Sequence, residues 1–324
     1  MDMKIPVDWL LQGEPWVEYR TRIDLLSEPE NEPHVVKSRA AMLVDPKVRA
    51  LITELDEWPG PVVSNHKNAS LLLHKLTFVA DLGISIHDPG IKQILGLIEK
   101  YHSPEGPYQV LTNIPVHFGG SGKDQMSWAL CDAPLLVYAL NKLGGDEVDT
   151  NQALSYLAGL CRSNGWPCAA SSELGKFRGP GRKEDPCPYA NLVMLKALSA
   201  NPKFKDDAVC HTGAETILSL WNESLTQHPY LFHMGTDFRK LKAPLIWYDL
   251  LHVLDVLTQF PWFKDDIRLR GMLDVLRSKS NSEGQFSAES IWTTWKEWEF
   301  GQKKVPSRWL TLLAWRVLNR EKVA

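Results

Sequence analysis

The sequence lacks several features that would assign it at once to a class of protein. It has only 5 cysteines in 324 residues, an odd number, which excludes the cysteine density of a small disulfide-stabilised protein. Charge of one sign is also lacking, since 39 acidic residues oppose 36 basic ones and leave a net charge of −3. Nothing in that balance indicates nucleic acid or an anionic membrane as a partner.

Long apolar runs are missing as well. No run reaches the roughly 18 residues of a membrane span, so we expect no transmembrane segment. The first residues, MDMKIPVDWLLQGEPW, contain acidic side chains and no extended apolar core, so they do not read as a signal peptide. A cytoplasmic location is therefore the expectation. The composition, 44% hydrophobic and 23% charged, is that of a folded globular chain.

A repeat of about 58 residues runs through the chain. Apolar segments end in a leucine at intervals of 56, 58, 58, 59 and 61 residues, at Leu26, Leu82, Leu140, Leu198, Leu257 and Leu318. Five of them are followed by a second segment, in order VVKSRAAMLVDPKVRALITEL, IKQILGLIEKY, NQALSYLAGLC, GAETILSLW and RGMLDVLRS. Alternation typical of β-strands is sparse. We therefore predict one all-α domain over residues 1–324, an α/α toroid of about six helical hairpins with nearly apolar inner and amphipathic outer helices.

The connections between hairpins are long and contain glycine turns. These turns read WPG, GPY, GWP and GQF at 58–60, 106–108, 165–167 and 284–286, and the fourth copy has WNES instead. About twenty residues lead from each outer helix to the next inner one, at 106–126, 165–186, 223–243 and 284–306. Long loops are usually functional or disordered, so the face where inner helices begin is the candidate active face.

One layer near that face carries polar side chains. Counting back eight residues from the landmark leucines reaches His74, Asp132 and Asp249, which we predict to be catalytic. A carboxylate within an apolar helix is costly unless it is paired or used. Aromatic residues expected to contact the substrate are Trp128, Tyr189, Tyr248 and Trp309. The alternative is that the polar residues are satisfied core groups and the aromatic ones pack the core.

Two basic loops precede inner helices. The segments GKFRGPGRKEDPCPY and HMGTDFRKLKAP supply the predicted anion-binding residues Arg178, Arg182, Lys183, Arg239 and Lys240. Glycine-rich basic loops before a helix N-terminus suit phosphate, so we expect a small-molecule substrate that is anionic or isoprenoid. Asp185 and Cys187 could instead bind a metal together, and a solvated basic loop beside a buried cysteine remains the simpler interpretation.

The hairpins, the aromatic-rich inner helices and the G-[W/Q]-[P/F] turns resemble the terpenoid cyclase/protein prenyltransferase superfamily over most of the chain. The resemblance implies an isoprenoid-type enzyme with an aromatic-lined central cavity, either a transferase that binds a prenyl diphosphate or a squalene cyclase-like enzyme. Asp185-Pro186-Cys187 is similar to the Asp-x-Cys zinc site of prenyltransferase β subunits, which implies zinc on Asp185, Cys187 and His252. His252 lies about a turn deeper than the family's histidine, and Asp249 occupies the nearer position.

A second part of the resemblance concerns the cyclases. Leu130-Cys131-Asp132-Ala133 is similar to the SDCT context of the acid in triterpene cyclases, which implies Asp132 as a proton donor. Two other functions stay open. A carbohydrate-active hydrolase or lyase would use Asp132 and Asp249 as its carboxylate pair, with the Trp-rich segment 291–300 as a sugar platform. A non-catalytic toroid would bind a lipid or a protein partner.

Overall fold

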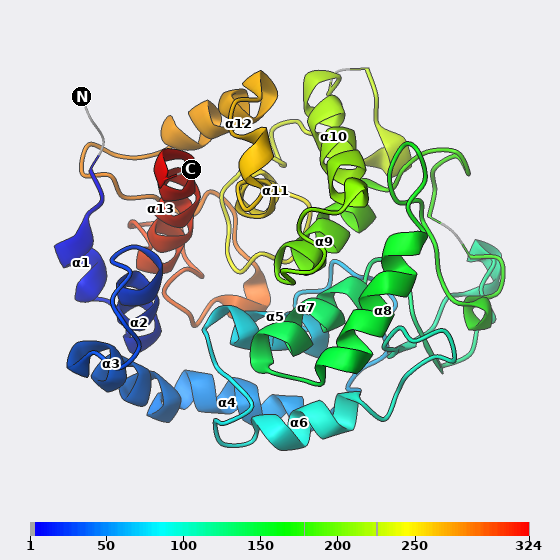
Figure 1. Ribbon diagram of the computed structural model, residues 1–324, viewed down its shortest axis with the longest axis horizontal. Helices are drawn as coiled ribbons and strands as arrows, with labels where there is room; N and C mark the ends of the chain where they lie inside the picture. Colours follow the sequence, from blue (N-terminus) through cyan, green and yellow to red (C-terminus); the bar gives the residue numbers. More distant parts are fainter. Residues whose placement is uncertain (1–3, 178, 225, 324) are drawn as a thin grey trace. The chain divides into compact units, whose positions relative to one another are not determined.

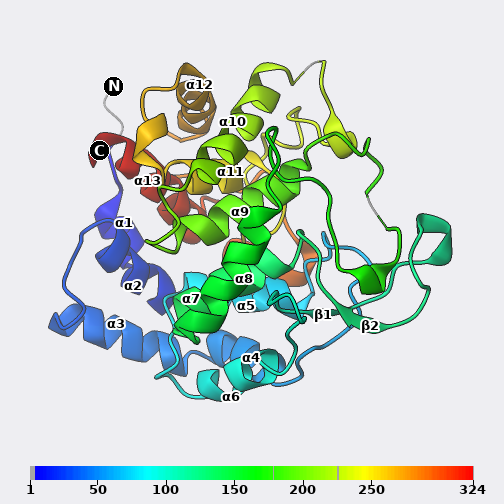
Figure 2. The ribbon, with the colours of Figure 1, turned by 45° about the vertical axis from the view of Figure 1, so that its right-hand side comes forward.

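A computed structural model describes residues 4–177, 179–224 and 226–323, and the chain in it is mainly α-helical (Figure 1). The strands found in these residues are β1 (Val110–Thr112) and β2 (Gln125–Ser127), which pair antiparallel with Leu111 opposite Met126 (Figure 2). The predicted all-α class is confirmed. Across the same residues, no helix combines the length and apolarity needed to cross a membrane.

The chain divides into two compact units. Unit 1 combines Met1–Ala50 with Met234–Ala324, and unit 2 is Leu51–His233. We describe each unit by itself. The single domain over residues 1–324 and its central cavity involve both units and stay predictions.

Unit 2 contains three of the predicted hairpins. Their first helices are α5 (Leu72–Asp81), α7 (Ala133–Leu143) and α9 (Pro188–Ser199). Their second helices are α6 (Ile91–Ile98), α8 (Glu147–Gly159) and α10 (Ala208–Asn222). The helix α7 packs between α5 and α9, while α8 contacts α7 and α9, and α10 contacts α9 (Figure 1). Every residue of α9 is buried, whereas α8 and α10 bury one face.

Unit 1 joins helices from opposite ends of the chain. Its helices are α1 (Val7–Leu11), α2 (Pro15–Asp24), α3 (Pro33–Val44), α11 (Leu250–Leu257), α12 (Ile267–Arg277) and α13 (Arg308–Val323). The helix α13 packs against both α11 and α2, and α11 packs against α12. The second segment of the first repeat is split into α3 and α4 (Pro46–Leu55), because Pro46 cannot continue a helix.

A buried ion network ties the helices of unit 1 together. Asp255 on α11 accepts hydrogen bonds from Arg316 Nη2 at 2.9 Å and from Arg320 Nη1 at 3.0 Å, both on α13. Arg316 Nη1 also lies 3.5 Å from Asp24 Oδ2 at the end of α2. Because Asp255 is only 4% exposed, these arginines provide the charge compensation that a buried carboxylate needs.

The glycine turns place a buried aromatic residue against the next first helix. In unit 2 the N–H of Trp166 donates to Asn191 Oδ1 on α9, at 3.0 Å. In unit 1 the N–H of Phe286 donates to Thr311 Oγ1 on α13, at 2.9 Å. The two acceptors both lie seven residues before a landmark leucine, so the repeat includes a side-chain hydrogen bond as well as an apolar pattern. Gly165 permits this contact, since its φ is +103° and a Cβ there would fall 2.5 Å from Asn191 Oδ1.

Candidate functional site

The two predicted catalytic aspartates lie at helix starts, which corrects their expected place inside the helices. Asp132 is the N-cap residue of α7, and Asp249 is the N-cap residue of α11. Aspartate is favoured there because its oxygen can accept a hydrogen bond from an unpaired amide of the first turn. The connections before these helices, residues 99–132 and 223–249, are therefore longer than the predicted twenty or so. His74 does lie within a helix, α5.

Asp249 uses its side chain to cap its own helix. Its Oδ1 accepts a hydrogen bond from the N–H of His252 at 3.1 Å, and burial raises the pKa of Asp249 to about 6. The imidazole of His252 is itself buried, with Nδ1 2.9 Å from the carbonyl oxygen of Trp247. In unit 1 these two predicted site residues therefore organise the start of α11.

Asp132 behaves differently from the other N-cap aspartates. Its side chain makes no hydrogen bond to α7, and its Oδ1 lies 2.7 Å from Nδ1 of His66. The carboxylate is 1% exposed, and its Oδ2 has no hydrogen-bond partner within the described residues. By contrast, aspartates that accept amide hydrogens from their own helices are Asp146, Asp207, Asp249 and Asp266. The Asp132 carboxylate thus pairs with a residue outside its own helix.

The side chain of His74 contacts the backbone of His66. The Nε2 atom of His74 lies 2.8 Å from the carbonyl oxygen of His66. Burial lowers the pKa of His74 to about 4, so His74 is neutral at pH 7 and this contact uses its N–H as a donor. Burial also opposes a charge on His66, but the charge and hydrogen bond of Asp132 outweigh it and raise the pKa of His66. The cationic form of His66 is therefore favoured beside Asp132.

Two cysteines interact electrostatically with each other and with this pair. Cys187 is the N-cap residue of α9, and its side chain makes no hydrogen bond to the helix. The thiol of Cys131 and the charge of His66 lower the pKa of Cys187 although burial opposes this. The thiol of Cys187 and burial raise the pKa of Cys131.

The sequence did not reveal His66 as a site residue. The segment 56–71 has no helical periodicity, and nothing but its distance of eight residues from His74 singles His66 out. Cys131 was noticed only as the neighbour of Asp132. The contact between His66 and Asp132 depends on the path of a long connection, which periodicity does not determine.

The glycine-rich loop that contains Gly179 and Gly181 packs against the ring of Tyr230. A Cβ on Gly181 would fall 2.6 Å from the ring of Tyr230, and one on Gly179 would fall 2.9 Å from it. The hydroxyl of Tyr230 donates to the carbonyl of Arg182 at 3.1 Å, and Asp185 Oδ2 accepts from the N–H of Arg182 at 3.3 Å. The glycines therefore make room for a tyrosine, and Asp185 closes its own turn.

The predicted anion-binding residues are exposed or half-buried where the structure describes them. Arg182 and Lys183 are exposed in unit 2, and Arg239 is exposed in unit 1. Lys240 is half-buried, with Nζ 3.4 Å from Asp237 Oδ1. Arg178 lies outside the described residues. The predicted anion site stays a prediction.

The predicted aromatic and metal residues are mostly buried. The aromatic ones, each at most 5% exposed, are Trp128, Tyr189, Tyr248 and Trp309. Of the predicted zinc ligands, Asp185 and Cys187 belong to unit 2 and His252 to unit 1. Among the residues the structure describes, no three or more His, Cys, Asp or Glu side chains form a group that could hold a metal ion. The zinc site stays a prediction.

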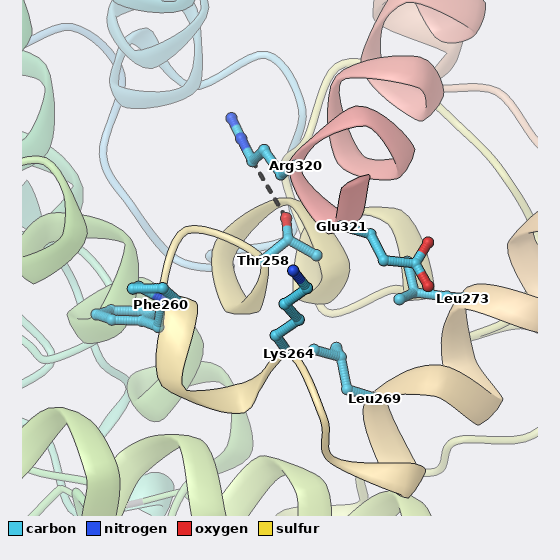
Figure 3. A pocket seen from close by; sticks show the side chains of 8 residues that line it. Thr258, Phe260, Lys264, Leu269, Leu273, Arg320 and Glu321 are labelled. Atoms are coloured by element: carbon cyan, nitrogen blue, oxygen red, sulfur yellow. Dashed lines mark hydrogen bonds between the residues drawn. The ribbon is translucent and has the colours of Figure 1, made fainter. Parts of the chain in front are cut away.

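A small pocket lies in unit 1. Thr258, Phe260 and Lys264 line it together with Arg320, whose Nη1 donates to Thr258 Oγ1 at 3.3 Å (Figure 3). Its free space is about 20 Å³, which is room for about one water molecule. An isoprenoid chain does not fit in that space.

No profile of a known protein family matches the chain, and no curated protein sequence is significantly similar to it.

Proposed function

We propose that this protein is an isoprenoid-type enzyme of the cyclase kind, with the Asp132–His66 pair as its proton donor. The observation that carries the proposal is the pairing of the Asp132 carboxylate with His66. The carboxylate lies at a helix N-cap, yet it pairs with His66 at 2.7 Å and leaves a buried oxygen without a partner in the described part of the chain. A buried carboxylate of this kind costs free energy unless it is used.

We also propose the α/α toroid for the chain as a whole. In unit 2 the first helices follow one another in chain order, since α5 contacts α7 and α7 contacts α9. In unit 1 the same order continues from α11 to α13, and α13 contacts α2. Both series of contacts are those expected between successive inner helices of a toroid of six hairpins, and this supports the proposal.

The chemistry follows from the charges of the pair. Asp132 raises the pKa of His66 and so favours a proton on the pair, in which the imidazolium and the carboxylate together carry no net charge. Transfer of that proton to an alkene or epoxide of the substrate creates a carbocation and leaves the pair with one negative charge. This negative charge, in a site with little water, attracts the developing cation. Neutral His74 contributes by fixing the position of His66.

The test is turnover of linear isoprenoids. The protein is incubated separately with squalene and with geranylgeranyl diphosphate, and products are analysed by gas chromatography and mass spectrometry, after dephosphorylation for the second substrate. We expect cyclised isomers from at least one of the two. Asp132→Asn removes the negative charge that favours the transferable proton on His66, and it should reduce product formation by about 10²- to 10⁴-fold, the usual contribution of a general acid.

A matched control is Asp146→Asn, because Asp146 is also an N-cap aspartate but serves only the start of α8. We expect it to retain turnover. Equal rates for Asp132→Asn and the wild type would refute the assigned proton donor. If the wild type converts neither substrate, the enzymatic proposal fails and the lipid-binding toroid becomes the better interpretation.

A further inference from the structure

We propose that α3 is a dimerisation surface, on which a second copy of this chain docks its own α3 in the antiparallel direction. The helix, Pro33–Val44, belongs to unit 1, and its buried residues are Val35, Ser38 and Met42. It packs against α2 within that unit. The inference concerns the opposite, exposed side of α3 and does not depend on the proposed function.

A second apolar stripe runs along the exposed side of this helix. Spacings of three, four and four residues separate four exposed residues, Pro33, Val36, Ala40 and Val44. Val36 is 52% exposed and Val44 is 68% exposed. This spacing is typical of a helix face that packs against another helix, whereas a helix that only covers a core presents polar and charged residues to water. The exposed side of α3 therefore has the pattern of a contact surface.

The stripe is symmetric about Ala40, which identifies the occupant as a second copy. Val36 lies four residues before Ala40, and Val44 lies four residues after it. When two copies of α3 pair antiparallel, Ala40 meets Ala40 of the other copy, and Val36 meets Val44. A two-fold interface requires self-complementarity of this kind. The small side chain of Ala40 lets the two helices approach closely at the axis.

The charges at the two ends of α3 are complementary in the same arrangement. Glu32 at the N-cap is exposed and makes no hydrogen bond to its own helix. At the other end, Asp45 separates α3 from the first turn of α4, where Arg49 is exposed (Figure 1). Glu32 lies eight residues before Ala40 and Arg49 nine residues after it, so antiparallel pairing brings opposite charges together. Such complementarity fixes the register of an interface, and parallel pairing would instead oppose like charges.

The predicted interface is small. The helix has 12 residues and is therefore about 18 Å long. One face of a helix of this length covers less than the roughly 800 Å² per partner of a standard protein–protein interface. We therefore expect a reversible dimer, with a dissociation constant on the order of 10–100 µM.

The experiment is sedimentation velocity of the full chain over about 5–500 µM, a range that brackets this constant. We expect a concentration-dependent shift from monomer to dimer. Val44→Glu places a carboxylate against Val36 of the other copy and should raise the dissociation constant at least about tenfold. The matched control is Val148→Glu, because Val148 is a valine of similar exposure, 72%, on α8 of unit 2. This variant should dimerise like the wild type.

Exchange of the charged ends tests the direction of pairing. Glu32→Arg and Arg49→Glu should each weaken the dimer, because each creates like charges across the interface. The double variant Glu32→Arg/Arg49→Glu restores opposite charges and should bind within about threefold of the wild type. Ala40→Cys should form an intermolecular disulfide on mild oxidation, since residue 40 lies beside its own copy at the axis, whereas Val148→Cys and the wild type should not.

Several results would overturn the inference. One is a chain that stays monomeric over the whole concentration range. Another is a dimer that Val44→Glu leaves intact, because a different surface would then form it. A third is a double charge variant that dimerises no better than the two single ones, because the ends would then not meet. The substitutions all lie at exposed positions, and circular dichroism establishes that each variant is folded.

Discussion

Replacement of Asn191 by alanine should destabilise unit 2 substantially. Its amide accepts from the N–H of Trp166 at 3.0 Å and donates to the carbonyls of Trp166 and Cys187 at 3.0 and 2.8 Å. The carbonyls keep other partners in Asn191→Ala, since the N–H of Cys187 still donates to Trp166 and the N–H of residue 191 to Cys187. The buried backbone N–H of Trp166, in contrast, loses its hydrogen-bond acceptor. An orphaned donor costs about 1–3 kcal/mol and each lost bond about 1 kcal/mol, so the free energy of unfolding should fall by about 2–5 kcal/mol.

The assay is thermal unfolding followed by circular dichroism. A loss of that size should lower the midpoint by roughly 3–7 °C in a protein of this length. The matched control is Asn222→Ala, because Asn222 is exposed at the end of α10 and its replacement should change stability by less than about 0.5 kcal/mol. A midpoint for Asn191→Ala that equals that of the control would refute the reasoning, since the turn at Trp166 would then not depend on the Asn191 amide.

Three further outcomes are expected in unit 1. Thr311→Val keeps the shape of the side chain but leaves the N–H of Phe286 without its acceptor, so urea denaturation should show a loss of about 1–3 kcal/mol. Glu299 is a carboxyl whose pKa burial raises from 4.5 to about 7, so the folded state binds its proton more tightly; stability should therefore fall as pH rises from 4.5 to 7, by up to about 3 kcal/mol. Glu299→Gln should flatten this part of the pH profile in calorimetry, and an unchanged profile would contradict the assignment. Asp255→Asn removes the buried carboxylate that Arg316 and Arg320 share, and Arg316 keeps only Asp24 at 3.5 Å, so it should cost about 3–5 kcal/mol in thermal unfolding; a neutral effect would show that the network is dispensable.

The helical repeat could be predicted because apolar burial imposes a period on the sequence. The leucines at 82, 140 and 198 mark α5, α7 and α9 correctly, since each of these helices buries almost its whole surface. The second helices were also located, because one apolar face gives a clear helical period.

The starts of the helices and the pairing of side chains were harder to predict from the sequence. Asp132 and Asp249 fit the leucine register as inner-helix positions. Asp249 instead caps its helix and Asp132 pairs with His66, and only the structure shows where each helix begins. The glycines at 179 and 181 indicated a phosphate loop, yet their neighbour is Tyr230, about fifty residues later in the chain. His66 was missed for the same reason, since contacts of this kind depend on loop paths and leave no periodic signal.

The composition of unit 1 from both ends of the chain has a consequence for synthesis. The helix α2 presents Trp16, Val17 and Tyr19 as buried residues. Its partners α1 and α3 lie next to it in the chain, but its partner α13 follows unit 2. Residues 51–233 form unit 2 and are made in between, which at 5–20 residues per second takes about 10–40 s. Unit 2 is continuous in sequence and can fold on the ribosome during that interval, while the part of α2 that α13 covers has not yet met this partner. That part of α2 is therefore open to chaperones and to aggregation until α13 is made.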